Sequence, residues 1–294
     1  ILYNRETAIL DNLEGGRFQH RGDEWEQSIE GCYRALHRAH VPVEFVDIDR
    51  LKKGLSSQFD VLYIPYCYAI DDEGMAALRS FVQGGGTLWA DGLTAWKNAM
   101  GHLRPSIPGE LADVFGFEAT DIYPVKVDEP YSVTDGNELA GELWKLPLEL
   151  QGADVVLRDK EGKPFATKHS FGKGKALYFE SALTLAYAKR GNAQIQDWIV
   201  GPARASAAGS ALHWREGSAR ISFRGLVHAT GAIAILSNWG AEEQVTVAFE
   251  GDCLVSELLT DAAPQVHREG ARTIARLSVP ASGVAVIRAV KRVA

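Results

Sequence analysis

The sequence predicts an α/β domain over residues 1–205, followed by a small antiparallel β-sandwich over residues 206–294. Three observations lead to this fold class. Helical and buried-strand patterns alternate along the first part, which favours a parallel sheet with helical crossovers. Short alternating segments separated by Gly, Asp and Pro fill the second part and favour antiparallel strands. Between them, residues 201–210 are mostly small and predict a linker.

The elements of the first domain follow from hydrophobic periodicity and from residues that begin or end helices. Apolar residues from Trp25 to Ala39 repeat at helical spacing, and Pro42 ends that helix. The residues at 1–3 already have a strand pattern, so we expect the chain to belong to a larger polypeptide. Strands are expected at 1–3, 43–47, 60–65, 87–90, 118–128, 153–158, 165–170 and 175–180, and helices at 24–40, 71–83, 108–115 and 194–200.

The second domain shows a period of two residues in short segments, which is the pattern of half-buried strands. So many short strands close together are typical of a small sandwich. The seven expected strands are 219–223, 232–238, 244–249, 254–259, 265–268, 273–278 and 284–290.

Charge, hydropathy and cysteine usage exclude several classes of function. The net charge is −7 and neither domain is strongly basic, so no nucleic-acid partner is expected. No apolar run approaches the ~20 residues that a membrane-spanning helix needs, so no membrane partner is expected. The three cysteines are far apart and form no CxxC pair, which favours a reducing, cytoplasmic location over a disulfide framework.

No cofactor and no metal site are expected. The sparse cysteines make structural zinc improbable. The three glycines at 84–86 precede a strand instead of following one, and they lack the residue order of a phosphate-binding loop. They are better explained as the end of a helix, where positive φ angles favour glycine.

Polar and aromatic residues after the predicted strands are the candidates for a ligand or an interface. Arg5 and Glu6 follow the first strand, and Asp91 follows the strand at 87–90. Because the carboxyl ends of parallel strands share one edge of a sheet, these side chains are expected to gather there. Trp96 lies just beyond, and its ring suits a sugar or a protein surface. The simpler interpretations are solvated charges, a helix cap and core packing.

No catalytic residue is assigned. The turn at 90–92 reads Ala-Asp-Gly, so it has neither Cys nor Ser where a nucleophile would stand. Cys67 follows another strand and is the alternative nucleophile, but a catalytic thiol needs a base. Only His102 and His169 are candidates for that base, and the simpler interpretation of Cys67 is a small buried hydrophobic residue.

Several segments together resemble the trimerisation domain of family 42 β-galactosidases. The resemblance covers residues 1 to about 200, and the β domain is similar to the small C-terminal domain of those enzymes through Ile235-Leu-Ser-Asn-Trp-Gly240. It includes Trp96-Lys97-Asn98, which adds Asn98 to the ligand or interface candidates. The other segments that carry it, in the expected order, are 32–47, 59–65, 81–88, 108–116 and 172–178.

The resemblance implies a flavodoxin-like first domain, similar to class I glutamine amidotransferases but without their nucleophile. In that family the catalytic carboxylates lie on a TIM barrel, which this chain does not contain, so no catalytic acid can be carried over. The implied role is assembly of a homotrimer and walling of the active site of that barrel. A galactoside-type sugar would then be a partner only through the barrel.

Two alternatives of different kinds stay open. The chain could be a carbohydrate-binding module that uses Trp96 and its neighbours, which calorimetry with galactosides and a Trp96→Ala variant would test. It could also be a hydrolase or amidotransferase that depends on Cys67, in which case a Cys67→Ala variant would lose the activity.

Overall fold

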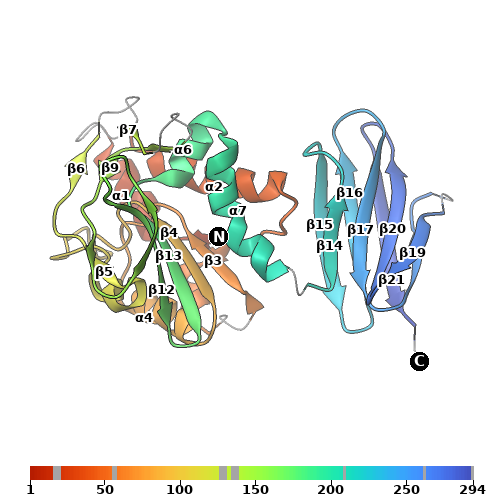
Figure 1. The fold of residues 1–294 in the computed structure, drawn as a ribbon, viewed down its shortest axis with the longest axis horizontal. Helices are drawn as coiled ribbons and strands as arrows, with labels where there is room; N and C mark the ends of the chain where they lie inside the picture. Colours follow the sequence, from red (N-terminus) through yellow and green to blue (C-terminus); the bar gives the residue numbers. More distant parts are fainter. Residues whose placement is uncertain are drawn as a thin grey trace. The chain divides into compact units, whose positions relative to one another are not determined.

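The computed structural model describes residues 1–15, 21–54, 58–125, 131–133, 139–207, 210–260 and 263–292. The chain forms two units, which Figure 1 draws in the colours of the sequence. The first comprises Ile1–Ala35 and Glu44–Pro202, and the second comprises Leu36–Val43 and Ala203–Ala294.

The first unit is built on a five-stranded sheet with the order β11-β12-β13-β4-β3. Its three neighbours β13, β4 and β3 are parallel, and β12 and β11 extend it in antiparallel fashion. These strands are β3 (Val61–Ile64), β4 (Thr87–Asp91), β11 (Asp154–Arg158), β12 (Pro164–Phe171) and β13 (Gly174–Phe179). A separate parallel pair consists of β1 (Leu2–Tyr3) and β2 (Val46–Asp47). The strands expected at 60–65 and 87–90 and the hairpin around residue 173 are therefore confirmed.

In the described residues, four helical segments are those that periodicity predicts and three are not. The expected ones are α2 (Glu24–Arg38), α4 (Asp72–Gln83), the turn η2 (Gly109–Leu111) continuing into α5 (Ala112–Phe115), and α7 (Ala193–Ala207). The unexpected ones are α1 (Arg5–Glu14), α3 (Ile48–Lys52) and α6 (Leu183–Arg190). In α6 the run from Leu183 to Tyr187 is buried on every side, so it has no amphipathic period to recognise.

One predicted strand and the predicted linker are wrong. Within 118–128, only β5 (Phe117–Glu118) and β6 (Tyr123–Pro124) are strands, and residues 126–128 lie outside the described residues. The segment changes partners, because β5 pairs with β10 (Glu149–Leu150) whereas β6 pairs with β9 (Trp144–Lys145). The linker expected at 201–210 is instead helical up to residue 207, since its alanines favour helix. A further short pair joins β7 (Tyr131–Ser132) to β8 (Ala140–Gly141).

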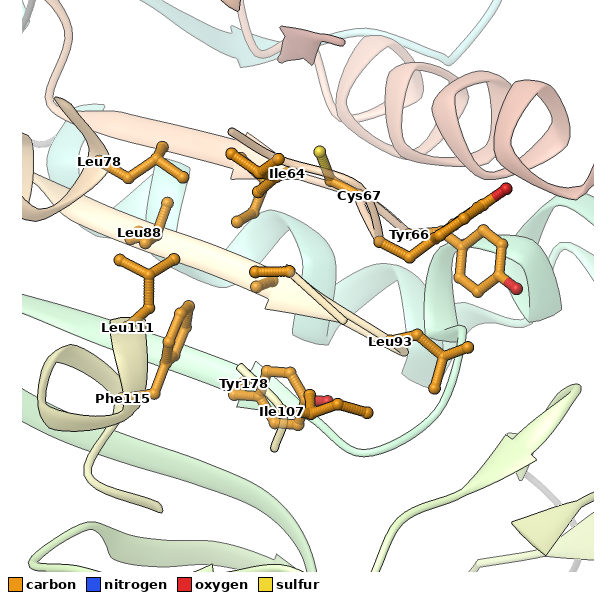
Figure 2. Close-up of a cluster of buried hydrophobic side chains, with 14 of the residues drawn as sticks. Ile64, Tyr66, Cys67, Leu78, Leu88, Leu93, Ile107, Leu111, Phe115 and Tyr178 are labelled. Atoms are coloured by element: carbon orange, nitrogen blue, oxygen red, sulfur yellow. The ribbon is translucent and has the colours of Figure 1, made fainter. Parts of the chain in front are cut away.

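The core of the first unit packs helices onto its parallel strands. Figure 2 shows Ile64 on β3, Leu88 on β4 and Tyr178 on β13, with Leu78 from α4 and Phe115 from α5 against them. All five side chains are almost completely buried, and each contributes roughly 1.5–3 kcal/mol by leaving water. This packing holds the strands rigidly, so it also positions the loops at their carboxyl ends.

The second unit consists of two four-stranded antiparallel sheets, in the orders β14-β17-β20-β19 and β15-β16-β21-β18. Phe249 and Ile287, one from each sheet, belong to its core. The sequence predicts seven of the strands and misses the first, β14 (Leu212–Glu216). The others are β15 (Ile221–His228), β16 (Gly231–Asn238), β17 (Glu243–Glu250), β18 (Cys253–Glu257), β19 (Gln265–Glu269), β20 (Arg272–Val279) and β21 (Val284–Lys291).

Candidate functional site

The turn after β3 is occupied by Tyr66. Its φ angle is +43°, which is an outlier for a bulky residue, and its side chain is completely buried. The Tyr66 hydroxyl accepts a hydrogen bond from Trp144 Nε1 at 3.0 Å. A Cβ atom at Gly92 would lie 2.9 Å from Cδ2 of Tyr66, so the ring packs directly on that glycine. A strained turn after a strand is where α/β hydrolases hold their nucleophile, but here it carries a structural tyrosine.

Asp91 at the end of β4 joins three segments from inside the fold. Its Oδ1 accepts a hydrogen bond from the Tyr66 backbone N–H at 2.7 Å. Its Oδ2 accepts bonds from the backbone N–H and the hydroxyl of Thr184 at 2.8 and 2.7 Å. Burial raises the pKa of Asp91 to about 6, although these hydrogen bonds act in the opposite direction. Asp91 is completely buried, so the structure places it beneath the sheet edge, and a contact with a ligand or interface stays a prediction.

Cys67 follows Tyr66 and is also buried, as Figure 2 shows at the end of β3. Its Sγ lies 3.4 Å from Asn4 Nδ2 and 3.7 Å from Thr7 Oγ1. Burial raises the pKa of the thiol to about 12, so it is protonated at neutral pH. Neither His102 nor His169 is placed to deprotonate the thiol, because in the described part of the chain no hydrogen bond joins either residue to Cys67. The geometry fits a small buried side chain better than a nucleophile.

The segments after β1 and β3 do meet, although the two strands belong to different sheets. Asn4 caps α1, because its Oδ1 accepts the backbone N–H of Glu6 at 2.9 Å. Asn4 Nδ2 and Thr7 Oγ1 both donate to the carbonyl oxygen of Ala69, at 2.8 and 2.9 Å. These polar groups therefore satisfy one another at the sheet edge. Asn4 stands before two helix-forming residues, which is the sequence signal that would have revealed α1.

Arg5 and Glu6 lie on the first turn of α1. Arg5 Nη2 is 3.2 Å from Oδ2 of Asp49, and both side chains are exposed. Such an exposed ion pair contributes about 0–1 kcal/mol to stability. The side chain of Glu6 is half-buried. The role of both residues as ligand or interface candidates stays a prediction.

The loop after β4 carries the remaining candidates, Trp96 and Asn98, on either side of Lys97. Lys97 Nζ bonds both carboxylate oxygens of Glu14 at 2.5 and 2.7 Å, which fastens the loop to α1. The same ammonium lies 4.8 Å from the ring centroid of Trp96, a cation–π contact on a half-buried ring. Asn98 Oδ1 accepts the backbone N–H groups of Met100 and of residue 102, both at 3.0 Å, and so shapes the loop.

The described residues contain no group of three or more His, Cys, Asp or Glu side chains placed to hold a metal ion. Among the helices of the described segments, none is long and apolar enough to cross a membrane.

The first unit is an α/β unit in which the turns at the carboxyl ends of the strands carry buried structural residues, and the second is an antiparallel β unit. This combination defines the class of protein. A family model described as the β-galactosidase trimerisation domain matches residues 1–201. The chain belongs to this family, which confirms the resemblance seen in the sequence.

Individual relatives are larger than this chain. β-Galactosidase BglY of Alicyclobacillus acidocaldarius is 27% identical over 208 residues, which cover 64% of this chain and 28% of BglY. The chain thus spans about a quarter of the length of that relative.

Solved structures share the fold at low identity. A catalytic mutant of Gan42B, a GH42 β-galactosidase from G. stearothermophilus, has a TM-score of 0.75 at 18% identity and covers 99% of this chain and 40% of its own. α-L-Fucosidase isoenzyme 2 from Paenibacillus thiaminolyticus has a TM-score of 0.65 at 15% identity, over 91% of this chain and 45% of its own. The fold is therefore shared with a protein named for a different sugar.

Proposed function

We propose that this chain is the non-catalytic assembly region of a β-galactosidase-like glycoside hydrolase. It brings three copies together and forms one wall of the active site of a catalytic barrel outside residues 1–294. The observation that carries this proposal is the match of residues 1–201 to the β-galactosidase trimerisation domain. A galactoside is the proposed sugar because the curated relative is named a β-galactosidase.

The geometry of the sheet edge supports a non-catalytic role. Asp91 and Cys67 are two groups that could have supplied a reactive atom there, and both are buried and committed to hydrogen bonds within the fold. A nucleophile must be exposed to its substrate and activated by a base, and Cys67 satisfies neither requirement.

The same edge supplies the groups for the proposed wall. Trp96 is half-buried, and its neighbour Lys97 is held by Glu14, so the ring and the ammonium are fixed in position. A fixed aromatic ring beside hydrogen-bond donors suits the face of a sugar ring. We include a flavodoxin-like fold in the proposal, supported by the parallel strands β3, β4 and β13. A cytoplasmic location is supported by the three free cysteines.

An assay with an aryl β-galactoside tests whether the chain is non-catalytic, and light scattering tests whether it assembles into trimers. We expect no turnover above the buffer rate and a mass near three times the 32.1 kDa of one chain. Turnover that survives rigorous purification and is lost in a Cys67→Ala or Asp91→Asn variant would overturn the non-catalytic half. A mass of one chain at every concentration would overturn the assembly half.

The second candidate function is a carbohydrate-binding module, and the half-buried Trp96 is the observation that favours it. Titration calorimetry with galactose and lactose would give heat that a Trp96→Ala variant loses. A Trp198→Ala variant is the matched control, because the Trp198 ring lies on α7 and packs on Phe179 instead of belonging to the loop after β4. Equal, negligible heats for wild type and variant would exclude this candidate.

A further inference from the structure

Helix α1 packs Ala8 and Leu10 against the core, but it also buries two polar side chains and exposes two large apolar ones. Thr7 and Asp11 are 0% and 3% exposed, whereas Ile9 and Leu13 are 53% and 69% exposed. Ile9 and Leu13 are four residues apart, so they share one face of the helix. A helix on the surface of a globular protein normally turns its apolar stripe to the core. In α1 this rule holds for Ala8 and Leu10 but not for Ile9 and Leu13, which leave an apolar strip on the outer face of the helix.

The polar contacts of α1 fix this orientation. Thr7 Oγ1 donates to the carbonyl oxygen of Ala69 at 2.9 Å and accepts its N–H at 3.1 Å. Asp11 Oδ2 accepts the backbone N–H of Trp25 at 2.9 Å. A rotation that buried Ile9 would break all three hydrogen bonds and leave buried polar groups without partners, at a cost of about 1–3 kcal/mol each. The apolar face therefore stays outward in the single chain.

The loop after β4 adds two exposed apolar side chains beside α1. Met100 and Leu103 are 78% and 62% exposed, and Met100 is the most exposed large apolar side chain among the described residues of the first unit. The loop lies against α1, because a Cβ atom at Gly101 would be 3.2 Å from Cδ2 of Leu10. The salt bridge between Lys97 and Glu14 joins the two elements a second time. We name Ile9, Leu13, Met100 and Leu103 together the α1–loop surface.

A cavity of about 520 Å³ borders the opposite flank of α1. Its lining includes Asp11 and Trp25 together with Tyr3 and Phe45, two aromatic side chains that are each 45% exposed. Most of the exposed large apolar side chains described for the first unit therefore lie on or beside α1. Exposed apolar side chains gathered around one element are typical of sites of protein association.

We propose that the α1–loop surface binds a second copy of this chain. The inference rests on the proposed assembly function and names the surface that performs it. The surface lies inside residues 1–201, the part that matches a trimerisation domain. Its chemistry also fits a protein partner, because aliphatic and methionine side chains pack against other side chains but offer a sugar neither a flat ring nor a hydrogen bond.

The symmetry of a trimer sharpens this inference. In a closed ring of three copies each interface is heterologous, so one surface meets a different surface of the next copy. Each copy then uses its α1–loop surface once, and charging this surface disrupts all three interfaces. Placing a lysine at an exposed position buries no charge in the single chain, so the fold itself should survive.

Sedimentation velocity of the double variant Ile9→Lys/Leu13→Lys, beside wild type at equal concentrations, tests the inference. Leu150→Lys and Val156→Lys are matched controls, because these residues are exposed apolar side chains on β10 and β11. We expect wild type and both controls to sediment as trimers and the α1 variant as a monomer, with self-association weakened at least tenfold. A second variant, Met100→Lys/Leu103→Lys, should give the same result without altering α1.

The outcomes separate this inference from the proposed function. If wild type and both surface variants remain trimers, the α1–loop surface is not the interface, although assembly stands. If wild type is a monomer, both the inference and the assembly function fail. Circular dichroism and thermal melting show whether a monomeric variant is folded. If the α1 variant is unfolded, the Met100→Lys/Leu103→Lys variant decides the test.

Discussion

Asp91 caps a helix that begins more than ninety residues further along the chain. Its Oδ2 accepts the backbone N–H of Thr184 at 2.8 Å and the Thr184 hydroxyl at 2.7 Å. The residue that precedes α6, Ala182, makes no side-chain cap, so the carboxylate takes over that task from β4. Its other oxygen holds the strained turn at Tyr66. One buried side chain thereby links the end of β4 to the turn after β3 and to the start of α6.

Replacing Asp91 with alanine should destabilise the fold. The change leaves the buried N–H groups of Tyr66 and Thr184 without acceptors, at a cost of about 1–3 kcal/mol for each group. Urea unfolding followed by tryptophan fluorescence measures the loss. Asp49→Ala is the control, because it breaks an exposed ion pair and should change stability by less than about 1 kcal/mol. Equal stabilities for the two variants would contradict the structural role of Asp91.

Glu180 should make stability fall as the pH rises from about 4.5 to 7. Burial raises its pKa from 4.5 to about 7, while hydrogen bonds from Tyr131 and Leu146 oppose the change. The folded chain therefore keeps a proton that the unfolded chain loses in this range, and unfolding becomes easier as the pH increases. The stabilisation that comes from the proton on Glu180 is complete below about pH 4.5 and lost above about pH 7.

A Glu180→Gln variant isolates this effect, because a glutamine does not titrate. Urea unfolding of both proteins at pH 5 and pH 8 should show a larger loss for wild type than for the variant. Asp91 contributes in the same direction in both proteins, so it cancels in the comparison. Identical pH dependence in wild type and variant would show that Glu180 is not protonated in the fold.

Cys67 should be unreactive in the folded protein. A buried thiol with a pKa of about 12 forms little thiolate at pH 8, and the thiolate is the form that alkylating reagents attack. Iodoacetamide should modify Cys67 at least tenfold more slowly in buffer than in denaturing urea, as followed by peptide mass spectrometry. Rapid labelling of Cys67 in the folded chain would revive the interpretation as a nucleophile.

The sequence predicts an element well when its buried positions are apolar, which explains why the buried strands are recognised and the helix α1 is not. Leu62 and Leu88 lie in strands covered on both faces, which produces an unbroken apolar run that is easy to recognise. In α1 the buried positions include Thr7 and Asp11, and the apolar Ile9 and Leu13 point outward. A method that looks for an apolar inner face therefore finds no helix there.

The sequence predicts where the residues of the candidate site lie along the sheet edge, but it does not predict what each of them contacts. The order of strands places Asp91 and Trp96 after β4, as expected. That Asp91 is buried depends on Tyr66 and Thr184, which are remote in sequence and meet it only in the folded chain. The contact between Lys97 and Glu14 likewise joins residues 83 positions apart. Such pairs carry no local signal, so the sequence showed the edge without showing what holds it together.

Sedimentation equilibrium of the wild-type chain over a wide range of concentrations tests the central claim most directly. We expect a species with about three times the 32.1 kDa mass of one chain, which dissociates only on dilution. A species with the mass of one chain at every concentration would contradict it.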